Sequence, residues 1–184
     1  MAKKRYNFTI YSDASYDPEL KLATASYIII DHRDGNIRQN TRIYSNLANS
    51  AQAELRGIID AVDSLPSGCG PYHVICDCES IIKSLNSLKD ANFLATSPKA
   101  EQLNLSLDDV VKLKKTKSKN ISFSWAPGHA GEVFNTIVDR ASRRVLREEK
   151  ERKLSGVSLF EDIIKDFASI SSEIAENSDV TAYA

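Results

Sequence analysis

Four acidic residues and one histidine are spaced along the chain in a pattern that could support metal-dependent chemistry. Asp13 lies in the stretch "YSDAS", Glu54 in "SAQAELRG" and Asp77 in "VICDCES". His129 and Asp139 stand ten residues apart in "WAPGHAGEVFNTIVDRAS", where glycines lie close to the histidine on both sides. Asp77 is the most informative of the acids, because a charge within an apolar run is rare unless it is paired or binds a metal.

Carboxylates from separate parts of the chain could form one site for divalent cations. Asp13 and Asp77 would lie side by side if their strands pair, since neighbouring strands are about 4.8 Å apart. Two carboxylates at that distance repel unless a cation lies between them, and oxygen ligands favour Mg²⁺ or Mn²⁺. Glu54 and Asp139 could complete a site for two ions about 3.5–4 Å apart, one activating a water and the other stabilising the leaving oxygen of a phosphodiester. His129 could transfer protons near neutral pH.

The spacing of apolar residues predicts a mixed α/β fold that would position these acids. Residues 6–15, 22–32 and 38–46 are typical of strands, and the "DGN" turn at 34–36 makes them an antiparallel meander. Helical spacing follows over 49–68, with Asn49 or Ser50 as the cap. Further strands are predicted at 72–80 and 120–127, and further helices at 80–88, 100–115 and 134–153. The order predicts a mixed five-stranded sheet, an antiparallel meander plus two parallel strands, flanked by helices.

Composition and charge limit the class of protein. The chain has 184 residues, of which 42% are hydrophobic and 27% charged, as in ordinary globular proteins. No apolar run approaches the length of a membrane span, so we expect no membrane partner. Three closely grouped cysteines indicate reduced thiols and a cytoplasmic location, and Cys76 and Cys78 are predicted to be small core residues. Basic residues cluster at 112–119 and 143–147, which is usual for a solvated helix face and also fits phosphate contacts.

The end of the chain differs from the rest in charge and pattern. Six acids and one lysine follow Gly156, although the net charge of the whole chain is only −1. We therefore predict a catalytic domain over residues 1–153 and an acidic C-terminal helical extension over 154–184. Residues 157–175 carry an apolar stripe at helical spacing. That stripe could pack on its own domain, or it could mediate self-association or bind a protein partner.

Taken together and in this order, the quoted stretches resemble a type 1 ribonuclease H over roughly residues 6–150, which implies a ribonuclease H-like fold for the predicted sheet. The most specific part is the family's "W-x-x-G-H-x-G" loop followed by an asparagine and an aspartate, which matches Trp125, Gly128, His129, Gly131, Asn135 and Asp139. The resemblance implies hydrolysis of the RNA strand of RNA–DNA hybrids, leaving 5′-phosphate and 3′-hydroxyl ends. It implies two Mg²⁺ ions, which Mn²⁺ could replace, and the metal-binding residues would be Asp13, Glu54, Asp77 and Asp139. His129 would assist proton transfer and product release.

The substrate-reading residues of this family are less well matched. The family's "D-G-S" is "DAS" here, and its "T-N-N" or "T-N-Q" is "NSA" at 49–51. The candidate substrate contacts by position are Ala14, Ser15, Asn49, Ser50 and Asn135. Two other functions fit these departures: a catalytically weak hybrid-binding module, or another nuclease of the ribonuclease H superfamily. The four acids and the histidine loop favour the ribonuclease.

Overall fold

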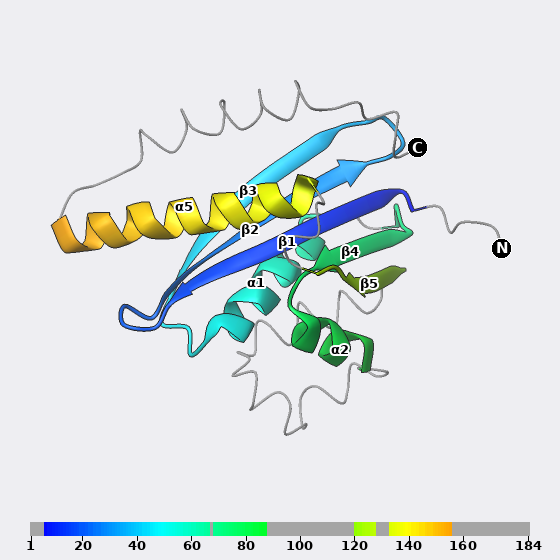
Figure 1. Ribbon diagram of the computed structural model, residues 1–184. Coiled ribbons are helices and arrows are strands. Elements are labelled where there is room, and N and C mark those ends of the chain that lie inside the picture. Colours follow the sequence, from blue (N-terminus) through cyan, green and yellow to red (C-terminus); the bar gives the residue numbers. More distant parts are fainter. Residues whose placement is uncertain (1–5, 67, 88–119, 128–132, 156–184) are drawn as a thin grey trace. The chain divides into compact units, whose positions relative to one another are not determined.

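The computed structural model describes residues 6–66, 68–87, 120–127 and 133–155 (Figure 1). Its strands are β1 (Phe8–Asp17), β2 (Leu22–Asp31), β3 (Ile37–Ser45), β4 (Tyr72–Cys76) and β5 (Ile121–Trp125). Its helices are α1 (Ser50–Asp63), α2 (Glu79–Ser87) and α5 (Val133–Ser155). The predicted helices at 100–115 and 157–175 lie outside the described residues. None of the described helices has the length and hydropathy needed to span a membrane.

The five strands form one mixed sheet in the order β3-β2-β1-β4-β5. β1 pairs antiparallel with β2, and β2 pairs antiparallel with β3, as the meander predicts. β4 lies parallel to both β1 and β5. The predicted fold class is therefore confirmed, and β1 is the central strand between the antiparallel and parallel parts. The chain divides into two compact units after Leu146, within α5, and residues 133–146 of this helix belong to the same unit as the sheet.

β4 is shorter than predicted, and its early end shapes the sheet. The pairing of β1 with β4 stops at Ser12 and Cys76, whereas β1 continues beside β2 as far as Asp17. Asp13 follows Ser12 within β1, and Asp77 follows Cys76 directly after the end of β4. The prediction that Asp77 lies inside the strand was wrong, because the chain bends at Asp77. The bend leaves its carboxylate partly exposed, which avoids the cost of burying a charge in the strand interior.

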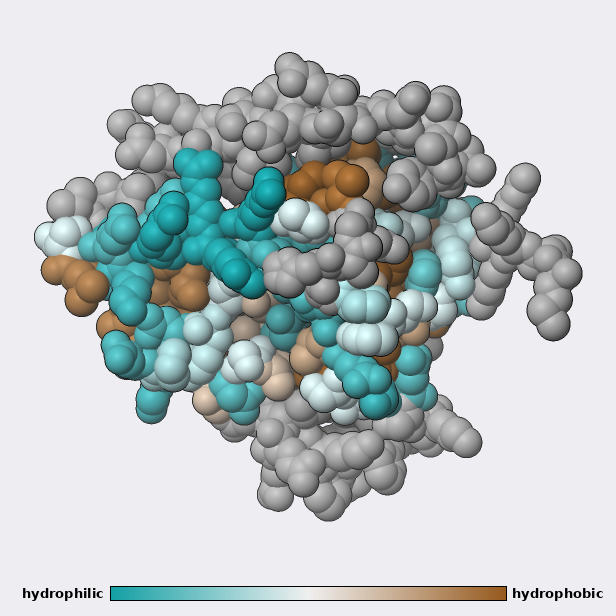
Figure 2. All heavy atoms as spheres, in the orientation of Figure 1, coloured by the Kyte–Doolittle hydropathy of each residue, from teal (hydrophilic) through white to brown (hydrophobic). Residues whose placement is uncertain are grey.

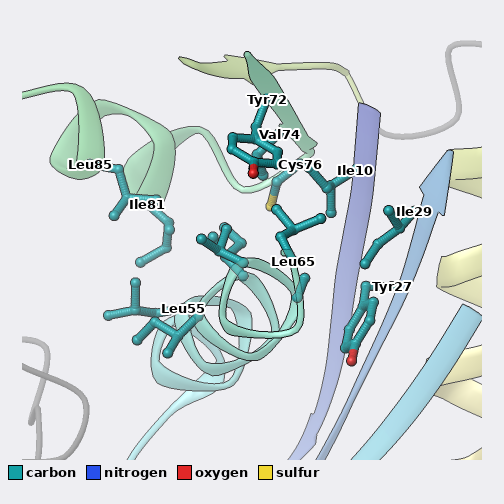
Figure 3. Packing of buried hydrophobic residues seen from close by; sticks show 14 of the residues in the cluster. Ile10, Tyr27, Ile29, Leu55, Leu65, Tyr72, Val74, Cys76, Ile81 and Leu85 are labelled. Atoms are coloured by element: carbon teal, nitrogen blue, oxygen red, sulfur yellow. The ribbon is translucent and has the colours of Figure 1, made fainter. Parts of the chain in front are cut away.

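The side chains of β1 alternate between two helices. Ile10 belongs to the core cluster with α1, and Ser12 lies against Gly57 of that helix. Residues of the other parity face α5, since Tyr11 contacts Phe134 at 5.4 Å between ring centroids. Figure 3 shows the α1 side of the sheet, where residues from β1, β2 and β4 pack on α1 and α2. β1 can thus present neighbouring residues to helices on opposite faces of the sheet.

Local interactions fix both ends of α1. The Asn49 carboxamide oxygen accepts the Gln52 backbone N–H at 2.9 Å, and the Gln52 side-chain oxygen accepts the Ala48 N–H at 2.8 Å. This capping was predicted, and the helix ends at Asp63, shortly before Pro66. Near its other end, Asp60 accepts a 2.6 Å hydrogen bond from the Tyr44 hydroxyl of β3. These contacts hold the helix that carries Glu54 at a fixed position on the sheet.

We expect Gly57→Ala to destabilise the fold by about 2 kcal/mol, because overpacking costs more than the improved helix propensity returns. A methyl group at Gly57 would lie 2.7 Å from the Ala25 Cβ and 3.0 Å from the Ser12 Oγ. The Ala25 Cβ cannot rotate away, so α1 would have to shift from the sheet. Urea unfolding of Gly57→Ala and of the double variant Ala25→Gly, Gly57→Ala measures the effect. Because Ala25→Gly removes the methyl group that the new side chain would meet, Gly57→Ala should destabilise the Ala25→Gly protein less than the wild type. Equal destabilisation in both backgrounds would show that the contact with Ala25 is not the cause.

Candidate active site

Asp13 lies on the α5 side of β1, where a serine of α5 holds its carboxylate. Asp13 is only 4% exposed, and Ser142 is completely buried. The Ser142 hydroxyl donates a 2.7 Å hydrogen bond to Asp13 Oδ2, and the Ser15 hydroxyl lies 3.1 Å from the Ser142 Oγ. On the neighbouring strand, the Thr24 hydroxyl donates to the Ser142 carbonyl at 2.6 Å. These bonds tie α5 to β1 and β2 beside the Asp13 carboxylate.

Asp139 is brought to the same place because it precedes Ser142 by three residues on the same side of α5. Its carbonyl oxygen lies 2.9 Å from the Ser142 Oγ. Its carboxylate forms a 2.6 Å ion pair with the Arg143 guanidinium, which is largely exposed. The Asp139 charge also acts on Asp13, whose pKa it raises, while Arg143 lowers that pKa. Arg143 therefore supplies one positive charge beside two carboxylates.

Glu54 approaches from the other face of the sheet. It projects from α1 and is 8% exposed. Its carboxylate accepts a hydrogen bond from the Ala14 backbone N–H, on the part of β1 beyond the last pair with β4. The Cys76 thiol also points at it, with Sγ 3.7 Å from Glu54 Oε2. The early end of β4 therefore gives Glu54 access to the exposed edge of β1.

Asp77 completes the group from the bend after β4. It is partly buried, and its backbone carbonyl accepts a 2.9 Å hydrogen bond from the Trp125 indole N–H. Its charge raises the pKa of both Asp13 and Glu54. The four acids predicted as one set thus come from β1, α1, the β4–α2 connection and α5. They meet at the end of β4, from both faces of the sheet.

The proximity and burial of these acids favour their protonated forms. Burial, with repulsion from Asp77 and Asp139, raises the pKa of Asp13 to about 7, against the lowering effect of Ser142 and Arg143. Burial, with repulsion from Asp13 and Asp77, raises the pKa of Glu54 well above its ordinary value. Carboxylates that repel at close range are relieved by a divalent cation, and their oxygens are the ligands that Mg²⁺ and Mn²⁺ prefer. The residues therefore fit a divalent-cation site.

The structure places the predicted substrate contacts at different levels of exposure. Ala14 and Ser15 are partly buried next to Asp13, and Ser50 is exposed as the first residue of α1. The Asn49 carboxamide oxygen is used by the helix cap. Asn135 is buried on α5, and its carboxamide oxygen has no hydrogen-bond partner among the described residues. The predicted catalytic His129 lies outside the described residues.

Three residues contact the acids in ways that were not predicted from the sequence: Ser142, Cys76 and Trp125. Ser142 follows Asp139 by three positions, a spacing that places both on one side of a helix and could have indicated a shared contact. Cys76 was predicted to be buried, which is correct, but its contact with Glu54 depends on how α1 packs. Trp125 is 46% exposed, and its indole N–H fixes the Asp77 backbone.

The mixed sheet thus gathers carboxylates from both of its faces where β4 ends, an arrangement suited to binding divalent cations. The family model described as RNase H matches residues 5–147. The chain belongs to the RNase H family. It is therefore a nuclease, a hydrolase that binds nucleic acid. No curated protein matches the chain in the search of those proteins.

Proposed function

We propose that the protein is a type 1 ribonuclease H, a metal-dependent endonuclease that hydrolyses the RNA strand of RNA–DNA hybrids. The products would carry 5′-phosphate and 3′-hydroxyl ends. The observation that carries this proposal is the gathering of Asp13, Glu54, Asp77 and Asp139 at the end of β4, with raised pKa values at the two most buried acids. Such an arrangement is costly without cations and is suited to binding them.

The four acids would act as the metal ligands. When bound, two Mg²⁺ ions, or Mn²⁺ in their place, supply an activated water and stabilise the leaving oxygen of the phosphodiester. Asp13 lies between the other acids and is held by Ser142, so it keeps one orientation before substrate arrives. Glu54 is held by the Ala14 N–H. His129 is proposed to assist proton transfer and product release.

Residues on both sides of the acids would contact the hybrid. Ser15 and the Ala14 backbone lie beside Asp13, and Ser50 is exposed at the start of α1. Contacts of this kind to 2′-hydroxyls across the minor groove would distinguish RNA from DNA. Asn49 and Asn135 would contribute through their carboxamides. Hydrophilic side chains gather along the middle of α5 in Figure 2, and its exposed Arg143 would add positive charge for phosphate groups.

The substrate is tested by comparing uniformly labelled duplexes in Mg²⁺ buffer. We expect cleavage of the RNA strand of the hybrid, and no cleavage of double-stranded RNA or double-stranded DNA. End-group analysis should show 5′-phosphates on the products. Cleavage of double-stranded DNA would indicate another nuclease of the superfamily, and binding of the hybrid without cleavage would indicate a binding module; either outcome would overturn the proposal.

We propose that residues 1–153 form the catalytic domain and residues 154–184 an acidic helical extension, in a protein of the cytoplasm. Residues 157–175 would pack on the domain, or bind a second copy or a protein partner. Sedimentation after truncation at Lys153 separates these alternatives, because an unchanged oligomeric state with lower stability would support packing on the domain.

Removal of the Ser142 hydroxyl should weaken the metal site and leave the fold in place. Ser142→Ala removes a hydrogen bond to a charged group, worth about 1.5–3 kcal/mol, from the Asp13 carboxylate. We expect about tenfold weaker Mn²⁺ binding by calorimetry on the substrate-free protein. The pH at which activity reaches half its maximum should rise, because Ser142 lowers the pKa of Asp13.

The matched control for this change is Ser84→Ala on α2, where the serine hydroxyl donates to the Ser80 carbonyl of the same helix. Its Mn²⁺ affinity should equal that of the wild-type protein. Equal Mn²⁺ affinity in Ser142→Ala and wild type would show that the Ser142 hydroxyl does not position Asp13.

A further inference from the structure

Cys76 places a sulfur atom beside two of the four acidic residues, Glu54 and Asp77. The ligand atoms of Glu54, Cys76 and Asp77 all lie within 4.8 Å of one another. They come from α1, from the last residue of β4 and from the bend that follows. Figure 3 shows the Cys76 side chain on the α1 side of the sheet. One thiol and two carboxylates form a mixed soft and hard set of ligands, which Mg²⁺ does not prefer and Zn²⁺ does.

We propose that Glu54, Cys76 and Asp77 form a binding site for a thiophilic divalent cation, with Zn²⁺ as the natural candidate. Zn²⁺ would bind through one sulfur and two carboxylate oxygens and keep a fourth position for water. Because Glu54 and Asp77 are also proposed ligands for Mg²⁺, zinc would displace Mg²⁺ and inhibit hydrolysis. The inhibition rests on the proposed function, whereas zinc binding itself does not.

The separations in the metal-free protein suit this cation. In tetrahedral zinc sites the zinc–sulfur bond is about 2.3 Å and the zinc–oxygen bond about 2.0 Å, which places sulfur and oxygen about 3.5 Å apart. Cys76 Sγ lies 3.7 Å from Glu54 Oε2. The Asp77 carboxylate oxygen lies within 4.8 Å of both ligand atoms. A shift of roughly 1 Å would bring it to zinc-binding distance. The two most buried ligands are therefore already at nearly the separation that zinc requires.

Burial and the neighbouring Glu54 carboxylate raise the pKa of the Cys76 thiol, so the thiol keeps its proton until a cation takes its place. The Cys78 backbone N–H donates to Cys76 Sγ at 3.3 Å, which stabilises negative charge on sulfur. Cys76 is completely buried, so its thiol is protected from exchange with other thiols. Binding of zinc would release the thiol proton to solvent and form the zinc–sulfur bond in its place. No oxidation or reduction takes part.

Spectroscopy on the full chain without nucleic acid tests the site directly. Titration with Cd²⁺ or Co²⁺ should produce an ultraviolet thiolate-to-metal charge-transfer band in the wild-type protein. The band should be lost in Cys76→Ser and kept in Cys78→Ser, which makes the same change two residues away at a half-buried thiol. A band that survives in Cys76→Ser, or that is absent from the wild type, overturns the proposal. Cadmium-113 NMR of the wild-type protein provides the same answer without a variant, since a sulfur ligand shifts the resonance downfield.

Competition with Mg²⁺ tests the inhibition. With hybrid substrate and saturating Mg²⁺, the zinc concentration that halves hydrolysis should be at least about tenfold higher for Cys76→Ser than for Cys78→Ser. Equal sensitivity of the two variants would overturn inhibition through Cys76. If the wild-type protein hydrolyses no hybrid, the proposed function fails, while the charge-transfer band still decides whether zinc binds here.

Discussion

Asp77→Asn is expected to reduce Mg²⁺-dependent hydrolysis of an RNA–DNA hybrid by about 10³-fold or more, with the fold intact. The change removes a charged metal ligand in the bend after β4, and loss of one such electrostatic contact typically costs about 10²–10³ in turnover even before a metal ion is lost. Asparagine keeps the size of the side chain. The backbone carbonyl that accepts the Trp125 indole N–H is unchanged.

The fold should survive because Asp77 contributes repulsion to the metal-free protein. Its charge raises the pKa of Asp13 and Glu54, and the neutral amide removes that effect. Single-turnover hydrolysis measures the loss, and circular dichroism with urea unfolding measures stability. Asp63→Asn, the same change at the exposed end of α1, should retain wild-type activity. Substantial hydrolysis by Asp77→Asn with Mg²⁺ would exclude Asp77 as a metal ligand.

The stability of the metal-free protein should fall as the pH rises from about 4 to about 7. Asp13 titrates near pH 7 in the folded chain and near 3.9 when unfolded, so the folded state binds more protons across that interval. The free energy of unfolding then decreases with pH, by up to about 4 kcal/mol for this group. The ion pairs of Asp31 and Glu149 lower the pKa values of these acids. Their contribution to stability is therefore lost as the pH falls, and this happens at more acidic pH.

Divalent cations should offset this loss. We expect Mg²⁺ to raise the melting temperature more at pH 8 than at pH 5, because protonated Asp13 does not bind a cation. Asp13→Asn should remove the part of the pH dependence that Asp13 contributes, leave the part due to Glu54, and be more stable than the metal-free wild type at pH 8. Asp34→Asn in the exposed turn should behave as wild type. A pH-independent response to Mg²⁺ would contradict a protonated Asp13.

Much of the fold follows from short-range sequence patterns. The alternation in β1–β3, the turn at Gly35 and the Asn49 cap depend on residues near one another in the chain, so they were predictable. Pairing of β1 with β4 was a condition for the predicted closeness of Asp13 and Asp77, and the structure has this pairing. The end of β4 was placed too late, since an apolar run does not reveal where a charged residue bends the chain.

Contacts made across the fold were beyond sequence reasoning. Ser142 reaches Asp13 only because one side of α5 lies on β1, and Cys76 reaches Glu54 only because Gly57 lets α1 approach the sheet closely. Spacing within a helix shows which residues share a side, but it does not show which strand that side will meet. The packing of α5 on β1 and of α1 on the sheet thus determines which side chains surround the acids.

The hydrogen bonds of Ser142 have a consequence for the order of events during refolding. Asp13 and Thr24 belong to the sheet, whereas Ser142 and Asp139 arrive with the last described helix. A refolding chain can therefore regain its strands and the α1 core before the fourth acid is in place. Recovery of hydrolysis after dilution from denaturant would report the docking of α5 on β1, and circular dichroism would report the earlier formation of secondary structure.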